Sequence, residues 1–280
     1  MGRAEVGGRP VIPEIIEVGE GRFRSDDHLF YDGLVSDPTR GRYRVDAGEL
    51  VAHAMAASER MHPGRRTLAA RTVFLREGLH DLPTEYAVDA LRAGRSMAFV
   101  TVRASQPDRG VIAETQLTLV GDLSGPSHQA ADVPDVDWSL TTPSQLDIAD
   151  PPVGLLGGGH LGGSGKAEPV VRAMLPMPRG LGTPLERAMY VAWQGAHFPT
   201  SAVLAPHAGI GFGTKSTWYT AVLVEDLRFW RPLGLEDDLR FDIVSPVMAD
   251  GAAQVTSQGF GPDGTLLVTC NLDMVVRKQG

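Results

Sequence analysis

The segment that decides the fold is DAGELVAHAMAASER, residues 46–60. Its apolar residues Leu50, Val51, Ala54 and Met55 recur at helical spacing. Asp46, with Glu49 three residues later, is typical of a capping box at a helix start. The many alanines favour a helix that a sheet wraps closely, and His62-Pro63-Gly64 ends it. The segment therefore predicts a long helix packed against a sheet.

Strand patterns follow this helix at residues 67–74, 85–91, 97–103 and 111–120. A polar turn at 92–95 and a Pro-Asp-containing turn at 106–110 separate the last three. A helix followed by an antiparallel meander is the predicted structural unit.

The same unit is predicted again in the second half. Thr183-Pro184-Leu185-Glu186 combines a capping box with proline at the first helical position, and Pro199 is expected to kink or break the helix. Strand patterns then cover 220–230, 238–244, 254–260 and 265–277, with a tight turn at 262–264.

Two landmarks repeat at one spacing. Residues 74–78 (FLREG) correspond to 229–233 (FWRPL), and Pro107-Asp108 corresponds to Pro262-Asp263, in both cases 155 residues later. This agreement predicts a duplicated domain of the α+β class. The expected boundaries are 1–121 for the first domain, 122–168 for a Gly- and Pro-rich linker, flexible at its Gly-rich end, and 169–280 for the second domain.

Composition limits the environment and the partners. The chain has 280 residues, 42% hydrophobic and 21% charged, and a formal net charge of -8, which argues against nucleic acid or anionic membrane as the main partner. A single cysteine, Cys270, excludes an internal disulfide and indicates a reducing compartment. Neither a secretory signal nor an apolar run long enough to span a membrane is found, so a cytoplasmic protein is expected.

Several motifs resemble those of the acyl-CoA thioesterase II family. Residues 74–78 and 91–96 resemble its FLRPG and LRDGRS signature, and residues 45–54 its FGGQVVGQA helix start. Residues 17–24 are similar to its opening strand, 229–232 to its FHRP and 206–207 to its PHG. The order and spacing of these motifs cover most of the chain outside the linker.

The resemblance implies a double hotdog fold, in which each of two long helices is wrapped by its own sheet. Family members hydrolyse acyl-CoA to free acid and CoA, using an Asp on the second-half helix, a Ser or Thr on the next strand and a Gln on the last strand. Aligning the motifs places Ala196, Val222 and Leu272 at these three positions. None of these side chains can activate water, so the family's usual site is expected to be absent.

Two groups of residues are candidates for a substitute site. In the first half these are Asp46, Glu49 and His53, although helix capping alone would explain Asp46 and Glu49. In the second half, His197 lies beside the lost Asp position, and Asp226 lies four residues after Val222, on the same strand face if the strand is regular. A buried core histidine and a solvated sheet carboxylate are the alternative interpretations.

Further positions are expected to contact substrate. They are Gly48, Ala196, Ser201, Val222 and Leu272, together with Arg92 and Arg95 as candidates for the CoA phosphates. Surface solvation explains each arginine equally well, and Cys270 is interpreted as a small buried residue. No metal and no cofactor other than the CoA of the substrate is expected.

Three function classes remain open on the sequence. The first is an acyl-CoA thioesterase with a non-standard site. A bulky natural-product acyl group is the hypothesis for its substrate, because Gly195 and Ala196 are small. The second is a non-hydrolytic enzyme acting on a thioester, of the dehydratase type, and the third is an inactive acyl-CoA-binding protein. In each case a homo-oligomer is expected.

Overall fold

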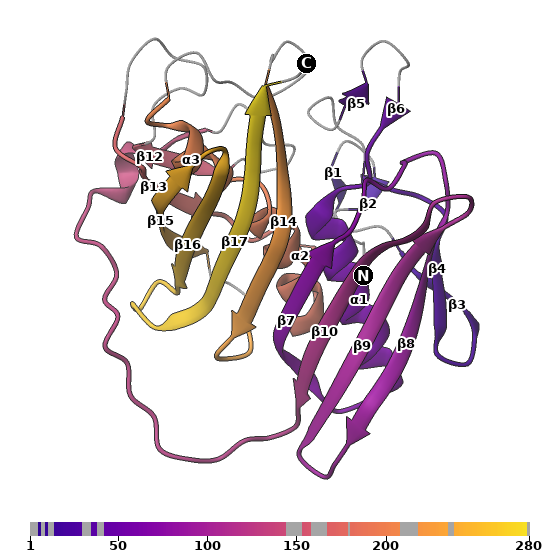
Figure 1. Cartoon of the computed structure of the whole chain (residues 1–280). Helices are drawn as coiled ribbons and strands as arrows, with labels where there is room; N and C mark the ends of the chain where they lie inside the picture. The colour runs from indigo at the N-terminus through magenta and orange to yellow at the C-terminus, as the bar shows by residue number, and fades with distance from the viewer. Residues whose placement is uncertain are drawn as a thin grey trace.

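The computed structural model describes residues 5–6, 9–10, 14–29, 35–37, 42–143, 153–157, 167–178, 180–207, 218–234 and 238–278. Within these residues most strands join one antiparallel sheet, with the long helices packed against it (Figure 1). The first-half elements are β3 (Ile16–Gly19), β4 (Arg22–Ser25), α1 (Ala47–Met61), β7 (Arg66–Phe74), β8 (Thr84–Ala93), β9 (Met97–Gln106) and β10 (Gly110–Val120).

The second-half elements follow a long connection. They are η2 (Trp138–Leu140), β11 (Thr142–Pro143), β12 (Gly154–Gly157), β13 (Val170–Leu175), α2 (Pro184–Gly195), α3 (Thr200–Leu204), β14 (Trp218–Phe229), β15 (Leu239–Ala249), β16 (Ala252–Phe260) and β17 (Leu266–Lys278). Two short hairpins lie outside the main sheet: β1 (Glu5–Val6) with β2 (Arg9–Pro10), and β5 (Val35–Asp37) with β6 (Arg42–Tyr43).

The main sheet runs in the order β11-β12-β13-β15-β16-β17-β14-β7-β10-β9-β8-β4-β3. First-half strands occupy one side of this order and second-half strands the other. They meet where β14 pairs with β7, with Val224 opposite Val73 and Arg228 opposite Ala69. The two halves therefore share one continuous sheet.

The predicted strands are present, and their spacing repeats. β8 begins at Thr84 and β15 at Leu239, β9 at Met97 and β16 at Ala252, again 155 residues apart. β7 and β14 end at Phe74 and Phe229, the landmark from which the repeat was predicted. The internal repeat seen in the sequence is thus also a repeat of strand positions.

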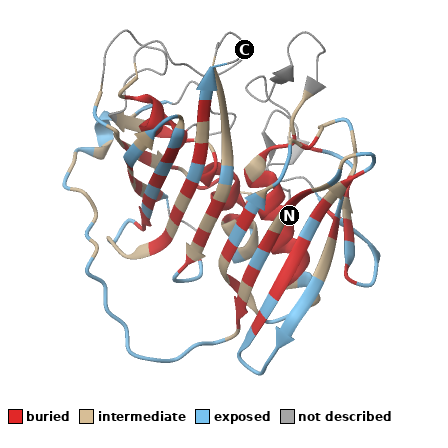
Figure 2. Cartoon of the chain, viewed as in Figure 1, coloured by how far each residue is buried: buried red, intermediate tan, exposed pale blue. Residues whose placement is uncertain are grey.

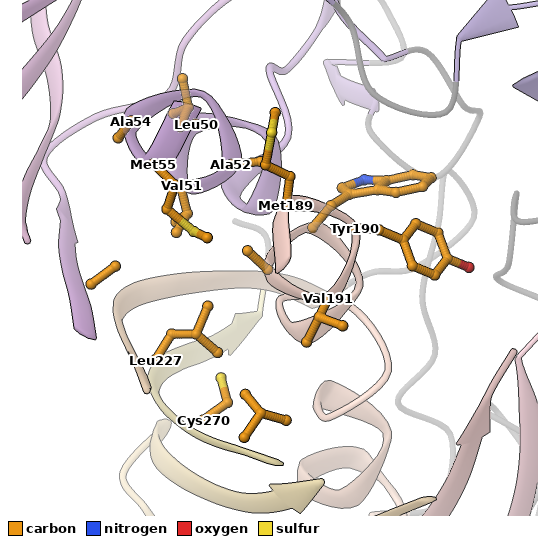
Figure 3. Packing of buried hydrophobic residues seen from close by; sticks show 14 of the residues in the cluster. Leu50, Val51, Ala52, Ala54, Met55, Met189, Tyr190, Val191, Leu227 and Cys270 are labelled. Atoms are coloured by element: carbon orange, nitrogen blue, oxygen red, sulfur yellow. The ribbon is translucent and has the colours of Figure 1, made fainter. Parts of the chain in front are cut away.

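Helix α1 is buried along nearly its whole length, as its alanines predict. Its N-cap is Asp46, whose side chain accepts a hydrogen bond from the Glu49 N–H. Figure 3 shows α1 lying against α2, with Leu227 and Cys270 of the second-half strands beneath α2. At the crossing Gly48 allows close approach, because a Cβ there would lie 2.4 Å from the Trp193 carbonyl oxygen.

Helix α2 begins and ends as predicted. Thr183 and Glu186 form the reciprocal hydrogen bonds of a capping box, and Pro184 occupies the first turn. The helix ends at Gly195, and α3 starts only after Pro199. The predicted break at Pro199 therefore separates two helices.

Two parts of the chain differ from the sequence interpretation. Residues 17–24 form the hairpin β3–β4, turning at Gly21 with φ +64°, instead of one opening strand. Within the predicted linker, residues 122–137 run outside the sheet and are largely exposed (Figures 1 and 2), but β11 and β12 extend the second-half sheet. The Gly-rich end of the linker, 158–165, lies outside the described residues.

In the part of the chain that the structure describes, no helix has both the length and the apolar character needed to cross a membrane.

Candidate active site

The two halves each contribute one residue to a polar pair. Nε2 of His197 lies 2.8 Å from Oδ2 of Asp46. Asp46 is the N-cap of α1, and His197 follows Ala196, the C-cap of α2. The tight crossing at Gly48 brings these two helix ends together. Sequence analysis named both residues, but as members of separate candidate groups.

The geometry of this pair suits a histidine base with an orienting carboxylate. Asp46 is held by the Glu49 N–H at 3.1 Å through Oδ1, which leaves Oδ2 for His197. The Asp46 side chain is 2% exposed and the His197 side chain 20% exposed, so the imidazole has access to solvent and the carboxylate has almost none. Nε2 faces Oδ2 of Asp46 at ion-pair distance, so a neutral ring that carries its proton on Nε2 can accept a proton at Nδ1.

The ring of His197 also packs against α2. Its centroid is 6.0 Å from the Trp193 ring, in an edge-on arrangement. Its backbone N–H donates to the Gln194 carbonyl, which continues the last turn of the helix. The imidazole is therefore positioned by the helix end as well as by Asp46.

A third ionisable group, Glu225 on β14, lies close to the pair and was missed by sequence analysis. Its side chain is fully buried. Among the described residues neither carboxyl oxygen has a hydrogen-bond partner. Burial and, secondarily, the negative charge of Asp46 raise the pKa of Glu225 well above its ordinary value, which favours the protonated, uncharged form.

Glu225 takes the place in the site that was predicted for Asp226. In the β14–β17 pairing the register shifts between Val222 and Val224, so Leu223 has no opposite residue in β17. This extra residue reverses the face on which the following side chains lie. Asp226 consequently lies on the outer face, half-buried, where it forms an ion pair with Arg228 at 2.9 Å. The regular strand assumed for Asp226 does not exist.

Glu49 and His53 belong to a separate, fully buried polar network inside the first half. Glu49 is 2.5 Å from Nδ1 of His28 through Oε1 and accepts from the Leu29 N–H through Oε2. His53 lies 2.8 Å from the Tyr86 hydroxyl. The Glu49 carboxylate also lies 3.8 Å from Nδ1 of His53 through Oε1, so the two residues predicted to act together are neighbours. In the described contacts only the Asp46 half of the predicted capping box forms.

Burial lowers the pKa of His28, but the hydrogen bond and the charge of Glu49 outweigh this effect and the net pKa is raised. Burial also raises the pKa of Glu49, which His28 partly offsets. The pair therefore keeps its shared proton to a higher pH than a free imidazole would. His28 carried no sequence signal, because it lies in a loop 21 residues before its partner.

Two of the predicted substrate-contact positions lie near Glu225 and the Asp46–His197 pair. Ala196 adjoins His197, and Leu272 faces Glu225 across the β14–β17 pairing, so these two line the same region. Val222 lies on β14 opposite Met274. Gly48 is packed against the α2 backbone, and the Ser201 hydroxyl donates to the Phe198 carbonyl.

Arg92 and Arg95 lie away from the Asp46–His197 pair, and Cys270 is buried in the core. Arg92 and Arg95 are exposed at the β8–β9 hairpin. Cys270 is buried with its Sγ 3.9 Å from the Gly195 carbonyl, and burial raises the pKa of its thiol, with Glu225 and Asp226 adding to the effect. These features agree with the interpretation of Cys270 as a small buried residue.

Solved structures share this fold over nearly the whole chain. The tesB protein of Mycobacterium avium subspecies paratuberculosis is 22% identical with a TM-score of 0.73, covering 94% of this chain and 96% of that one. The acyl-CoA thioesterase II of Mycobacterium marinum is 19% identical with a TM-score of 0.73, covering 95% and 96%. A hot dog-fold protein from Alicyclobacillus acidocaldarius is 14% identical with a TM-score of 0.70, covering 94% and 96%.

At these identities the likeness establishes the fold, which is the hotdog fold. Residues 38–120 in addition match the family model of the acyl-CoA thioesterase N-terminal domain. The resemblance to acyl-CoA thioesterases is thereby confirmed in sequence for this segment, and the whole chain shares the fold of solved thioesterase II structures. No curated protein gives a significant match to the chain.

Proposed function

We propose that this chain is an acyl-CoA thioesterase whose working site is the Asp46–His197 pair. The observation that carries the proposal is the 2.8 Å contact between Asp46, buried at one helix start, and the partly exposed His197 of the other half. The matched thioesterase domain at residues 38–120 supports the substrate class. Our alignment of the family motifs puts Ala196, Val222 and Leu272 at the positions of the family's catalytic residues, which is why a substitute site is proposed.

In this mechanism His197 acts as general base. Its Nδ1 accepts a proton from water while the water oxygen attacks the thioester carbonyl carbon. Asp46 orients the ring and stabilises the imidazolium that forms. The resulting oxyanion collapses, the carbon–sulfur bond breaks, and the imidazolium returns the proton to the departing CoA sulfur. The products are the free acid and CoA.

The fold is proposed to be a double hotdog, with domains 1–121 and 169–280. Each half has one long helix packed on an antiparallel meander, and the strands repeat at a constant spacing, which supports this division. In this arrangement the single site lies between the domains, because Asp46 and His197 come from different halves.

The acyl group is proposed to be bulky, because the end of α2 carries little side-chain volume. Gly195 and Ala196 precede His197, and a Cβ at Gly195 would lie 3.8 Å from both Oε1 of Glu225 and Sγ of Cys270. A methyl group at this position therefore fits without a clash but occupies space beside the pair. Gly195→Ala should lower kcat/KM for a polycyclic acyl-CoA more than for a linear one. Equal loss on both would remove the argument for a bulky substrate.

A second candidate function is dehydration of a 3-hydroxyacyl thioester. The observation that favours it is the buried carboxyl group of Glu225, with its raised pKa, near the His197 base. Dehydration needs one group to accept the C2 proton and another to protonate the departing hydroxyl. Such an enzyme would change the acyl chain and leave the thioester intact.

One experiment separates these functions. Short, long, aromatic, polycyclic and 3-hydroxyacyl CoAs are incubated with the wild type, and free thiol and the mass of the remaining acyl-CoA are followed together. The proposal expects thiol release, reduced about 10²–10⁴-fold in His197→Ala because the general base is removed. Asp226→Asn is the matched control and should release thiol at the wild-type rate.

Each of the other outcomes contradicts a different part of the proposed function. If the acyl-CoA loses about 18 mass units, the mass of one water, and no free thiol is released, the dehydratase is favoured. Binding of acyl-CoA with neither thiol release nor a change in acyl-CoA mass would favour an acyl-CoA-binding protein. Thiol release that His197→Ala leaves untouched would keep the thioesterase and reject the site.

A further inference from the structure

Glu225 is exceptional among the buried carboxyl groups of the described residues. Three such side chains are buried, Asp46, Glu49 and Glu225. Asp46 is bound by the Glu49 N–H and His197, and Glu49 by His28 and the Leu29 N–H. Both oxygens of Glu225 lack a hydrogen-bond partner within the described residues. A fully buried polar group without a partner requires a specific explanation, and a ligand group is one.

The neighbours of Glu225 do not satisfy its carboxyl group. In the sheet Glu225 lies opposite Leu272 on β17 and Thr72 on β7. The Thr72 hydroxyl is 2.9 Å from the Thr115 hydroxyl and is thereby engaged on its own strand pair. The Cys270 side chain on β17 contacts the Gly195 carbonyl instead.

The same carboxyl group lies next to the proposed site. The position of a Cβ on Gly195, at the end of α2, is 3.8 Å from its Oε1, and His197 lies two residues further along the chain. From the other side, the charge of Asp46 acts on Glu225. The acid therefore lies beside the Asp46–His197 pair and is fully buried.

A neutral carboxyl group in such surroundings can serve as a hydrogen-bond donor to a carbonyl oxygen. Its O–H is fixed in place before reaction and needs no reorganisation when negative charge develops on that oxygen. An ionised carboxylate could only repel the charge. Burial and the neighbouring charge of Asp46 both raise the pKa of Glu225, which favours this donating form.

We infer that Glu225 is a catalytic residue that donates a hydrogen bond from its carboxyl O–H to the thioester carbonyl oxygen of a bound acyl-CoA. This inference rests on the proposed function for the identity of the ligand. During reaction the attacking water gives its proton to His197 and its electron pair to the carbonyl carbon. The π pair moves to the carbonyl oxygen, where Glu225 stabilises it. Glu225 keeps its proton throughout, and the carbon–sulfur electron pair leaves with sulfur.

The test uses an acyl-CoA ketone analogue in which a methylene replaces the thioester sulfur, with ¹³C at the carbonyl. This analogue keeps the carbonyl oxygen and cannot be hydrolysed. Its carbonyl stretching frequency, measured by infrared difference spectroscopy, falls when the oxygen accepts a strong hydrogen bond. The wild type is compared with Glu225→Met, which has a similar length and no donor, and with Glu225→Gln, which keeps an N–H donor.

The expected result is a lowered carbonyl frequency in the wild type, a smaller shift in Glu225→Gln and the least shift in Glu225→Met. Asp226→Asn, one residue away on the outer face, should match the wild type. A frequency shift in Glu225→Met equal to that of the wild type, with the analogue bound in both, would overturn the inference. Failure of the analogue to bind the wild type would overturn it as well. If Glu225→Met does not fold, a Glu225→Gln shift indistinguishable from that of the unbound analogue overturns it.

Kinetics separates this inference from the proposed function. If hydrolysis occurs, Glu225→Met should reduce kcat about 10²–10³-fold with little change in KM, as for loss of one oxyanion donor. Glu225→Gln should recover part of the loss. If no thioester is hydrolysed by the wild type but the Glu225-dependent frequency shift is present, the proposed hydrolysis fails and the carbonyl contact of Glu225 stands.

Discussion

Glu225 takes up a proton when the chain folds, at pH values between its unfolded-state pKa and its raised folded-state pKa. Its unfolded-state pKa is near the ordinary value of 4.5, and its folded-state pKa is well above this, because of burial and the nearby charge of Asp46. The unfolded state therefore binds fewer protons than the folded state between these two values, and stability falls as pH rises through that window. Below pH 4.5 the penalty is absent, because the group is protonated in both states.

This linkage gives the first prediction. Glu225→Gln removes the proton uptake, so its free energy of unfolding should fall less steeply with pH than that of the wild type, by up to about 1.4 kcal/mol per pH unit. Urea unfolding at several values from about pH 5 to about pH 8 measures the two slopes. Asp226→Asn should keep the wild-type slope. Parallel curves for wild type and Glu225→Gln would show that Glu225 is ionised in the folded protein.

The His28–Glu49 pair gives a second prediction at the same scale. His28→Leu removes the nearer of the two imidazoles around the fully buried Glu49 and leaves His53 at 3.8 Å, and we expect a loss of about 3–5 kcal/mol in the free energy of unfolding. Glu49→Leu combined with His28→Leu should recover a large part of this loss, because no buried charge is then unpaired. Denaturant unfolding of the two single variants and the double variant measures the coupling. Additive losses would mean that the 2.5 Å contact contributes nothing of its own.

At the scale of single elements, the sequence predicted where helices and strands lie better than which side chains face inward. The apolar periodicity and the caps Asp46 and Thr183 located both long helices. Asp226 was placed in the site because a regular strand was assumed, whereas the register shift after Val222 turns Glu225 inward. A signal was present: Glu225 alternates with the buried Leu227 and Phe229, so its position already pointed to the core.

The crossing of α1 and α2 gives a third prediction. A Cβ at Gly48 would lie 2.4 Å from the Trp193 carbonyl oxygen, and backbone cannot move aside as a flexible side chain can. Gly48→Ala should therefore destabilise the protein by about 1–3 kcal/mol, although alanine is the better helix former. Hydrolysis should also decrease, because Asp46 and His197 meet at this crossing.

Thermal or urea unfolding and a thiol-release assay provide the two measurements for Gly48→Ala. Gly94→Ala is the control, because its nearest contact would be the Met97 carbonyl oxygen at 3.5 Å, an ordinary distance. Wild-type stability in Gly48→Ala would mean that the helices cross less closely than described.

At the scale of the whole molecule, the 155-residue repeat predicted the arrangement of the strands, but the sequence could not predict the site. Asp46 and His197 were separate candidates because no local pattern states which helix ends meet. That contact depends on α1 and α2 packing at Gly48 and on β14 pairing with β7. The domain boundaries and the oligomeric state remain predictions.

The contact between the halves gives a fourth prediction. A protease site introduced between Leu123 and Gly125, both exposed, should allow the linker to be cut without separating the halves. They would remain joined by the β14–β7 pairing and by contacts such as Arg66 with the Phe229 carbonyl at 3.0 Å. Size-exclusion chromatography should give one peak with unchanged thioester hydrolysis. Two separate peaks would contradict the shared sheet.

The central claim is that one site is shared by the two halves, and a double-mutant cycle on kcat/KM tests it most directly. The variants are Asp46→Asn, His197→Ala and the double variant, assayed on the best acyl-CoA substrate. If the pair acts as a unit, the double variant should lose no more activity than His197→Ala alone, because Asp46 acts only through the imidazole. Losses that multiply in the double variant would show that the two residues act independently and would contradict the shared site.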